Sequence, residues 1–161
     1  MIRLSLLVWL VYVSAASAAD VPSATQISAD IKARGAHAVV NDLTTRDQWD
    51  TVTDRIAKGG SEWIALAPLL APGSDAGSAE DLGIVLAYAL PKNPVAVLKA
   101  LDPSNGFVIG ADRVCGIPFI ENSVKDRPKY KRKAIRAVKS VKAASLLQAK
   151  KACLAKLQNS R

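Results

Sequence analysis

Apolar residues recur at intervals of three and four along most of the chain, and Gly and Pro divide this pattern into short segments. Such spacing places apolar side chains on one face of an α-helix. Trp49, Val52 and Ile56, for example, would share one face. No segment before residue 105 shows the sustained alternation of apolar and polar residues that marks a strand, so no sheet is expected there. The pattern predicts an all-α protein of six or seven short helices.

Polar residues and prolines indicate where these helices begin. Ser, Thr, Asp and Asn cap helices because their side chains accept a hydrogen bond from an unpaired backbone N–H. Proline is favoured in the first turn, and glycine just after the last residue. A second short helical piece is expected over 36–43, and Gly35 and Gly59 are expected to end helices. The expected N-caps are Thr25 or Ser28, Thr44 or Thr45, Ser61, Ser78, Asn93 before Pro94, and Asp126 before Pro128.

The central segment 59–101 contains a weak internal repeat. A shift of about thirty residues brings the apolar positions of 52–70 onto those of 82–101, so that Val52 and Ile56 fall near Leu82 and Leu86. This match favours two stacked αα-hairpins, as in helical repeat proteins. The alternative is that any two amphipathic hairpins align this well, because both follow the period of the helix.

Residues 102–120 are the least regular part of the chain. A turn-forming cluster, 102–106, precedes two apolar stretches, and the second contains Gly116 and Pro118. Because Gly and Pro interrupt regular helices, a helix throughout is not expected. A short strand, or an extended segment lying across the helices, is predicted for 114–120, and 107–120 as a whole is expected to be irregular.

The N-terminus has the pattern of a secretory signal peptide over residues 1–19. Arg3 precedes an apolar run, 4–13, and only small residues follow over 14–19. An apolar run of this length is too short to span a bilayer. Cleavage is expected near Ala18 or Ala19, which would leave 20–161 as a single periplasmic or secreted domain. The alternative is an uncleaved anchor.

Two cysteines, Cys115 and Cys153, are present. In an oxidising compartment an even number of cysteines favours a disulfide, and Cys153 shares an apolar helical stripe with Leu157. A bridge closing a loop of about 39 residues would contribute about 3 to 4 kcal/mol. The alternative is two separate buried thiols. No metal site is expected, because the single histidine, His37, is distant in sequence and cannot complete a tetrahedral set.

Charge is divided unevenly along the chain. Residues 125–161 contain thirteen Lys and Arg and one acid, a net charge of +12, whereas residues 20–124 contain eight bases and thirteen acids, a net charge of −5. Tyr130, Ala134 and Val138 would form the inner side of a basic helix. The cations assigned to a partner-binding face are Lys129, Lys131, Arg132, Lys133, Arg136 and Lys139.

Three interpretations of this basic third remain open. It could be a solvated face that complements the acidic body, a docking surface for an acidic protein partner, or a surface for anionic envelope material or nucleic acid. Nucleic acid is disfavoured because the signal peptide removes the chain from the cytoplasm. Apart from Tyr130, no aromatic residue is interleaved to stack on bases. A membrane surface is less favoured than a protein partner.

Catalytic signatures are missing from the sequence. It contains no Gly-x-Ser-x-Gly elbow, His-Glu-x-x-His motif, P-loop or dinucleotide fingerprint, so no cofactor is expected. These observations favour a non-catalytic binding module. One alternative is an envelope hydrolase that uses two carboxylates, such as Asp42 with Asp75. Another is a structural envelope factor that binds anionic lipid through its basic helices.

Several short motifs between residues 63 and 120 carry a resemblance. They are Trp63 before an apolar helix, the run Pro72-Gly73-Ser74-Asp75-Ala76, the pair Asn93-Pro94, and Val114-Cys115-Gly116 with Pro118-Phe119-Ile120. In these the chain resembles small, uncharacterised exported helical proteins of Gram-negative bacteria. It is similar in type, though not in motif, to periplasmic immunity proteins of contact-dependent toxin systems. This resemblance implies an inhibitor or immunity protein and assigns no functional residue.

Overall fold

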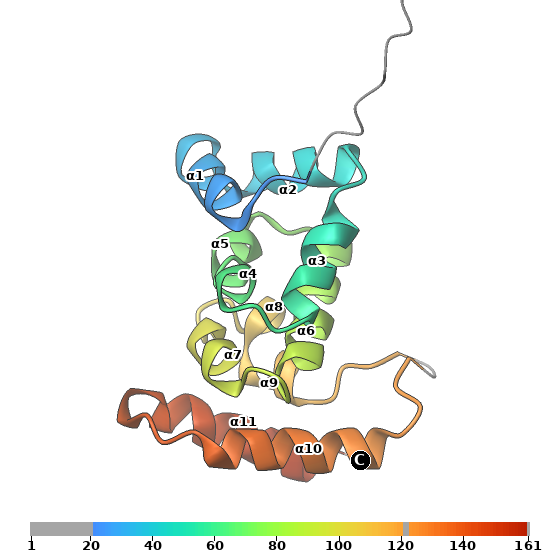
Figure 1. The fold of residues 1–161 in the computed structure, drawn as a ribbon, viewed down its shortest axis with the longest axis vertical. Helices are drawn as coiled ribbons and strands as arrows, with labels where there is room; N and C mark the ends of the chain where they lie inside the picture. Colours follow the sequence, from blue (N-terminus) through green and yellow to red (C-terminus); the bar gives the residue numbers. More distant parts are fainter. Residues whose placement is uncertain (1–20, 121–122, 161) are drawn as a thin grey trace, which may run out of the picture.

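The computed structural model describes residues 21–120 and 123–160, and within them it shows helices and no β-strand (Figure 1). The prediction of an all-α fold is confirmed. The helices, α1 to α11, are more numerous than the six or seven expected, because α4, α5, α8 and α9 have only four or five residues each. The predicted signal peptide, residues 1–19, lies outside the described residues.

The helices follow one another with short connections. The first part of the chain forms α1 (Ala24–Arg34), α2 (Ala36–Thr45), α3 (Trp49–Ala57), α4 (Ser61–Ile64), α5 (Ala67–Leu70), the 3-10 turn η1 (Ala71–Gly73) and α6 (Ala76–Ala89). The second part forms α7 (Pro94–Ala100), α8 (Gly106–Ile109), α9 (Ala111–Cys115), α10 (Arg127–Ser140), the 3-10 turn η2 (Ala144–Leu146) and α11 (Leu147–Asn159).

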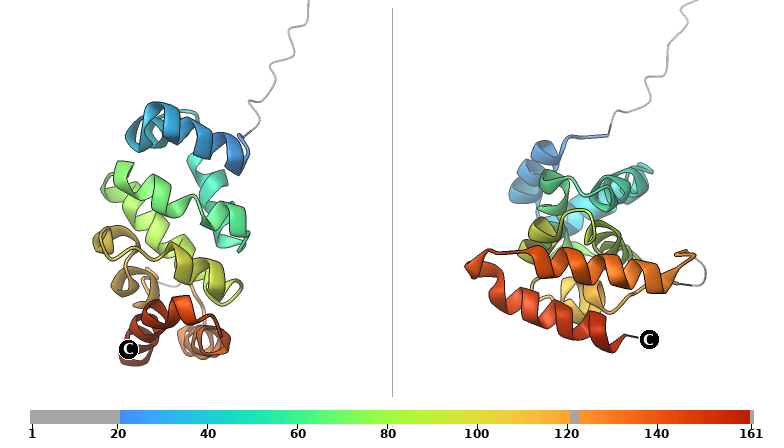
Figure 2. Two further views of the ribbon diagram at one scale, coloured as in Figure 1. Left: turned by 90° about the vertical axis from the view of Figure 1, so that its left-hand side faces the viewer. Right: turned by 60° about the horizontal axis from the view of Figure 1, so that its bottom comes forward.

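The helices stack along the long axis of the molecule, with α1 and α2 at one end and α10 and α11 at the other (Figures 1 and 2). Between these ends α3 packs against α6, α4 contacts α7, and α9 packs against α11. One cluster of buried apolar side chains extends through the stack from Ala24 to Leu157. Trp49, Val52 and Ile56 belong to it, as their spacing predicted.

Two predicted helix starts are confirmed in atomic detail. The side chain of Asn93 accepts a hydrogen bond from the backbone N–H of Ala96 at 3.1 Å, and Asp126 accepts one from Lys129 at 2.7 Å. Each cap satisfies a backbone donor that has no partner inside the helix. Proline follows in the first turn of both helices, as expected.

The predicted starts of α1 and α6 are wrong by a few residues. Ser23, rather than Thr25 or Ser28, caps α1, and it forms a reciprocal capping box with Gln26. Asp75, rather than Ser78, caps α6, and Ser78 closes that box from within the helix. Hydrogen bonds from Ser78 hold the pKa of Asp75 below its ordinary value. Several residues near each start could serve as the cap, and their order in the sequence does not distinguish among them.

The other two predicted caps lie inside helices. Thr44 and Thr45 are the last residues of α2, and their hydroxyls donate to backbone carbonyls one turn earlier. Ser61 is the first residue of α4, and it accepts a hydrogen bond from Asn93 at 3.0 Å instead of capping its own helix. Ser and Thr hydroxyls can bond locally in either way, so the sequence alone does not decide between them.

The expectation of an irregular segment over 107–120 is wrong as far as Cys115, whereas the part of 114–120 that follows Cys115 is not helical. Residues 106–109 form α8 and residues 111–115 form α9, with Ile109 and Val114 fully buried. The carboxylate of Asp102 accepts hydrogen bonds from Ser104 and Asn105 and shapes the turn that leads into α8. Only the part after Gly116 is irregular, and it begins with Ile117 at a φ of 61°.

The predicted disulfide is present between Cys115 at the end of α9 and Cys153 in α11. Their Cα atoms lie 5.2 Å apart, and both residues are fully buried. The bond covalently joins two helices that already pack against each other. It thereby fixes α11 at the end of the stack.

Replacing both Cys115 and Cys153 by alanine should lower the free energy of unfolding by about 3 to 4 kcal/mol, because the unfolded chain gains loop entropy. Urea denaturation followed by circular dichroism measures this loss. Reductant should lower the stability of the parent to the same level and leave the variant unchanged. Equal stabilities of the oxidised parent and the variant would contradict the assignment.

Gly73 allows η1 to approach the start of α2. A Cβ atom at this position would lie 2.3 Å from the backbone C of Ala36 and equally close to the backbone N of His37.

Gly73→Ala should therefore destabilise the protein by about 1 to 3 kcal/mol in urea denaturation. The matched control is Gly77→Ala in α6, where the new Cβ would meet only Asp75 Oδ1 at 3.8 Å. That change should be neutral or stabilise by up to about 1 kcal/mol, and equal effects of the two would be inconsistent with the close approach.

Candidate functional site

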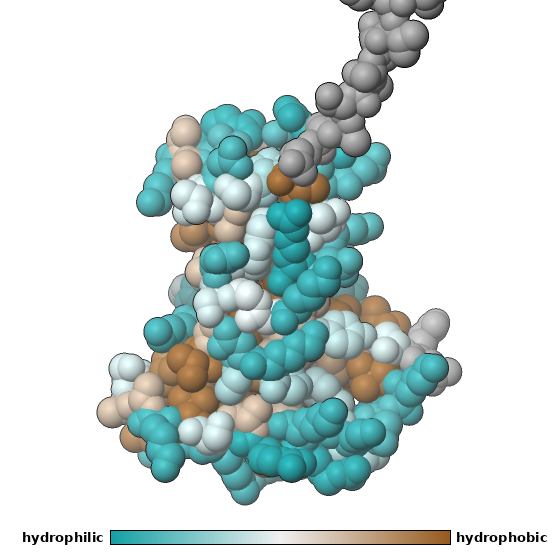
Figure 3. All heavy atoms as spheres, viewed as in Figure 1, coloured by the Kyte–Doolittle hydropathy of each residue, from teal (hydrophilic) through white to brown (hydrophobic). Residues whose placement is uncertain are grey.

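The outer face of α10 carries most of the cations that the sequence assigned to a binding surface. Tyr130, Ala134 and Val138 are buried and face the body of the protein. The opposite face is basic, and we call it the α10 stripe. It consists of Lys129, Arg132, Lys133, Arg136 and Lys139, all of them exposed. Successive residues of the stripe are one or three positions apart. At this spacing all five side chains project from one side of the helix. In Figure 3 the lowest part of the molecule, over α10, is hydrophilic.

The α10 stripe has no internal counter-charge among the residues that the structure describes. The ion pairs there join Arg34 and Arg46 to aspartates, Arg113 to Glu80, and Lys156 to Asp112. None involves the stripe. Like charges three or four residues apart on a helix destabilise it by a few tenths of a kcal/mol per pair, roughly. The stripe therefore weakens α10 as an isolated helix and remains free to attract an anionic group.

Lys131, the sixth predicted residue, does not belong to the stripe. Its ammonium donates to the carbonyl of Gln158 at 3.1 Å and to that of Ser160 at 2.5 Å, at the end of α11. Lys150 of α11 bonds in return to the carbonyls of Lys139 and Val141 at the end of α10. Each helix therefore has its final carbonyls satisfied by a lysine of the other, which couples the two as a hairpin.

Tyr130 attaches α10 to α6. Its hydroxyl donates to the carbonyl of Ala87 at 2.8 Å, and its ring meets that of Phe119 edge-on with centroids 4.7 Å apart. Phe119 also packs on Tyr88, and its carbonyl accepts a hydrogen bond from Arg127 at 2.6 Å. Burial raises the pKa of the Tyr130 hydroxyl above its ordinary value. These contacts hold the stripe in a fixed position relative to the stack.

The carboxylates considered for hydrolysis have structural partners. Asp42 pairs with Arg46 at 2.9 Å and with Arg34 at 3.3 Å, and Arg34 also pairs with Asp30. The hydrogen bonds that the Arg34 guanidinium donates to Asp30 and Asp42 raise the pKa of Arg34. Asp75 is occupied as the cap of α6. Within 21–120 and 123–160 no group of three or more His, Cys, Asp and Glu residues is placed to hold a metal ion.

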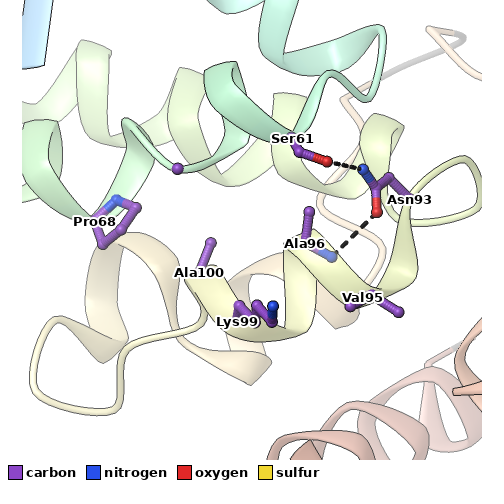
Figure 4. A pocket seen from close by; sticks show the side chains of 8 residues that line it. Ser61, Pro68, Asn93, Val95, Ala96, Lys99 and Ala100 are labelled. Atoms are coloured by element: carbon purple, nitrogen blue, oxygen red, sulfur yellow. Dashed lines mark hydrogen bonds between the residues drawn. The ribbon is translucent and has the colours of Figure 1, made fainter. Parts of the chain in front are cut away.

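Sequence reasoning missed two hollows on either side of α7. The smaller, of about 360 Å³, lies between α7 and the α4–α5 segment, where Asn93 bonds to Ser61 (Figure 4). The larger, of about 820 Å³, lies between α7, the α8–α9 region and α11. Lys99 of α7 lines both hollows. No sequence motif signals them, because their walls come from segments far apart in the chain.

Alkaline pH should test the anchoring of α10. The folded state keeps the proton on Tyr130 to higher pH than the unfolded chain does, because an exposed tyrosine has a pKa of about 10 and burial raises the pKa of Tyr130 above it. The stabilisation from this group is therefore complete below that pH and is lost as the pH rises above it. In urea denaturation at a series of pH values, Tyr130→Phe should lose about 1 kcal/mol at neutral pH through the missing hydrogen bond. It should also lose less stability above pH 10 than the parent does, and parallel pH profiles would contradict the buried hydroxyl.

Comparison with known proteins does not add a relative. No protein-family model, curated protein or solved structure matches the chain. The described helices also include none that is both long and apolar enough to cross a membrane. Any functional assignment must therefore rest on the sequence and on the geometry of α10 and its surroundings.

Proposed function

We propose that this chain is an exported, non-catalytic binding module that docks an acidic protein surface on the α10 stripe. The observation that carries the proposal is the presence of five exposed cations on one helix face with no carboxylate partner in the described part of the chain. Arg and Lys arranged in this way attract acidic surfaces over distances of about a Debye length and accelerate their encounter.

The rigidity of the platform supports docking. Tyr130 bonds α10 to α6, the paired lysines join α10 to α11, and the disulfide joins α11 to α9. A fixed set of charges loses little conformational entropy when a partner binds. The disulfide is also compatible with an oxidising compartment, in keeping with the signal peptide expected over residues 1–19.

The partner class follows from these properties and from the resemblance to exported helical proteins. An inhibitor or immunity protein works by covering a surface of its target, and it needs no catalytic residue of its own. We infer a periplasmic toxin or hydrolase with an acidic surface as the target. We also infer that α3 with α4–α5, and α6 with α7, are two copies of a helical hairpin unit, since α3 packs on α6 and α4 contacts α7.

Reversing three charges of the stripe tests the proposal. Arg132→Glu, Lys133→Glu and Arg136→Glu together should weaken capture of the partner from periplasmic extract by about tenfold or more. Capture by the parent should fall as salt is raised, because exposed charges are screened. Quantitative mass spectrometry of the retained proteins measures both effects.

The control reverses two exposed lysines elsewhere, Lys32→Glu and Lys58→Glu, which also have no ion pair among the described residues. Circular dichroism should show that both variants fold. Loss of binding in both variants, or in neither, would contradict the stripe as the docking surface. Binding of the parent to anionic lipid vesicles, with no protein retained, would favour the structural envelope factor instead.

A further inference from the structure

The larger hollow beside α7 has the size and lining of a small-molecule pocket. Its volume of about 820 Å³ falls within the range of about 300 to 1,000 Å³ typical of ligand sites. Leu98 is buried at the back, and Leu101, Pro103, Leu146 and Ala149 contribute further apolar wall. The small side chains on α11, together with two glycines of the α8–α9 region, leave this space open.

The polar groups of the pocket have a net positive charge. Lys99, Lys156 and Asp112 are the ionisable residues of its lining. Lys156 forms an ion pair with Asp112, which neutralises both charges. Lys99 is exposed and has no hydrogen bond or ion pair among the described residues. Figure 4, a view of the smaller hollow, labels Lys99 on α7. An apolar wall beside a single unpaired cation suits a ligand with an apolar body and an anionic end.

Apolar surface extends beyond the pocket itself. Phe107 is 87% exposed and Leu147 is 47% exposed, and both are among the few large apolar side chains exposed in the described chain. Phe107 directly follows Gly106 of the lining, and Leu147 lies between two lining residues, Leu146 and Gln148. Exposed apolar side chains are thus carried by two of the elements that form the pocket, α8 and α11.

We propose that this pocket binds a single-chain amphiphile, with the alkyl chain against α7 and α11 and the anionic head group paired with Lys99. Long-chain carboxylates and single-chain lipids with a phosphate head group share this chemistry. The site is separate from the α10 stripe, so the proposal stands whether or not the stripe docks a protein.

Isothermal titration calorimetry with decanoate, undecanoate and dodecanoate, each below its micelle concentration, tests the apolar part. Binding should have a stoichiometry of one. Each added methylene should tighten it about fourfold, because burying one CH₂ contributes about 0.8 kcal/mol. Binding with no dependence on chain length, or with many ligands per protein, would overturn the proposal.

Two variants test the apolar wall of the pocket and the contact with the head group separately. Ala152→Phe, at an exposed lining position of α11, should abolish binding of decanoate by filling the pocket without disturbing the core. Lys99→Met should weaken decanoate by about tenfold and leave the neutral alcohol decanol unchanged. The matched control, Lys133→Met on the stripe, should bind like the parent. An Ala152→Phe variant that folds and binds decanoate normally would refute the site.

A third experiment distinguishes the two possible sources of the ligand. Dodecanoate and a single-chain phosphatidylglycerol of the same chain length are titrated separately. Tighter binding of the carboxylate points to a free fatty acid, and tighter binding of the phospholipid points to a product of membrane lipid breakdown. Binding of neither would overturn the proposal.

Discussion

The covalent junction between α9 and α11 is the constraint on which both proposed binding surfaces depend. Cys115 and Cys153 fix α11 against the body of the stack. On one side α11 supports α10, whose final carbonyls it satisfies through Lys150. On another side α11 forms a wall of the pocket next to α7. If α11 moved, the positions of the basic stripe and the apolar pocket would change together, because both are built on the same helix.

The division of charge along the sequence becomes informative only when the ion pairs are assigned. If the basic C-terminal third served to neutralise the acidic body, its cations would pair with that body. Lys156 does so, with Asp112, whereas the five cations of the α10 stripe form no ion pair among the described residues. The arginines of the body pair with its own carboxylates instead, as in the network of Arg34, Asp30 and Asp42. The positive charge of the α10 stripe therefore has no ion-pair partner among the described residues, which favours an external one.

The sequence predicted the buried positions better than it predicted the helix ends. Trp49, Val52 and Ile56 are in the core because their spacing places them on one apolar face, and that face of the helix is the one that is buried. The ends of α1 and α6 were misplaced because several Ser, Thr and Asp residues lie near each start, and each could accept the same backbone bond. Residues 106–115 form helices although Gly and Pro are nearby, because Gly106 and Gly110 stand at helix starts, where they interrupt no helical bond. Tertiary burial of Ile109 and Val114 then outweighs the weak local preference.

The two candidate sites differ in how far the sequence could predict them, because one lies on a single helix and the other is formed by several. The α10 stripe was predictable in outline, because its residues share one helix and their spacing alone places them on one face. Lys131 lies off the stripe, on the side of the helix that holds Ala134 and Val138, and its ammonium donates to the carbonyls of Gln158 and Ser160 at the end of α11. The pocket could not be found in the same way, since it exists only where α7, the α8–α9 region and α11 meet. Its volume depends on residues that are small, such as Ala149 and Ala152, and a missing side chain leaves no periodic signal. A surface formed by one helix can thus be read from the chain, whereas a cavity shared by several helices requires their packing.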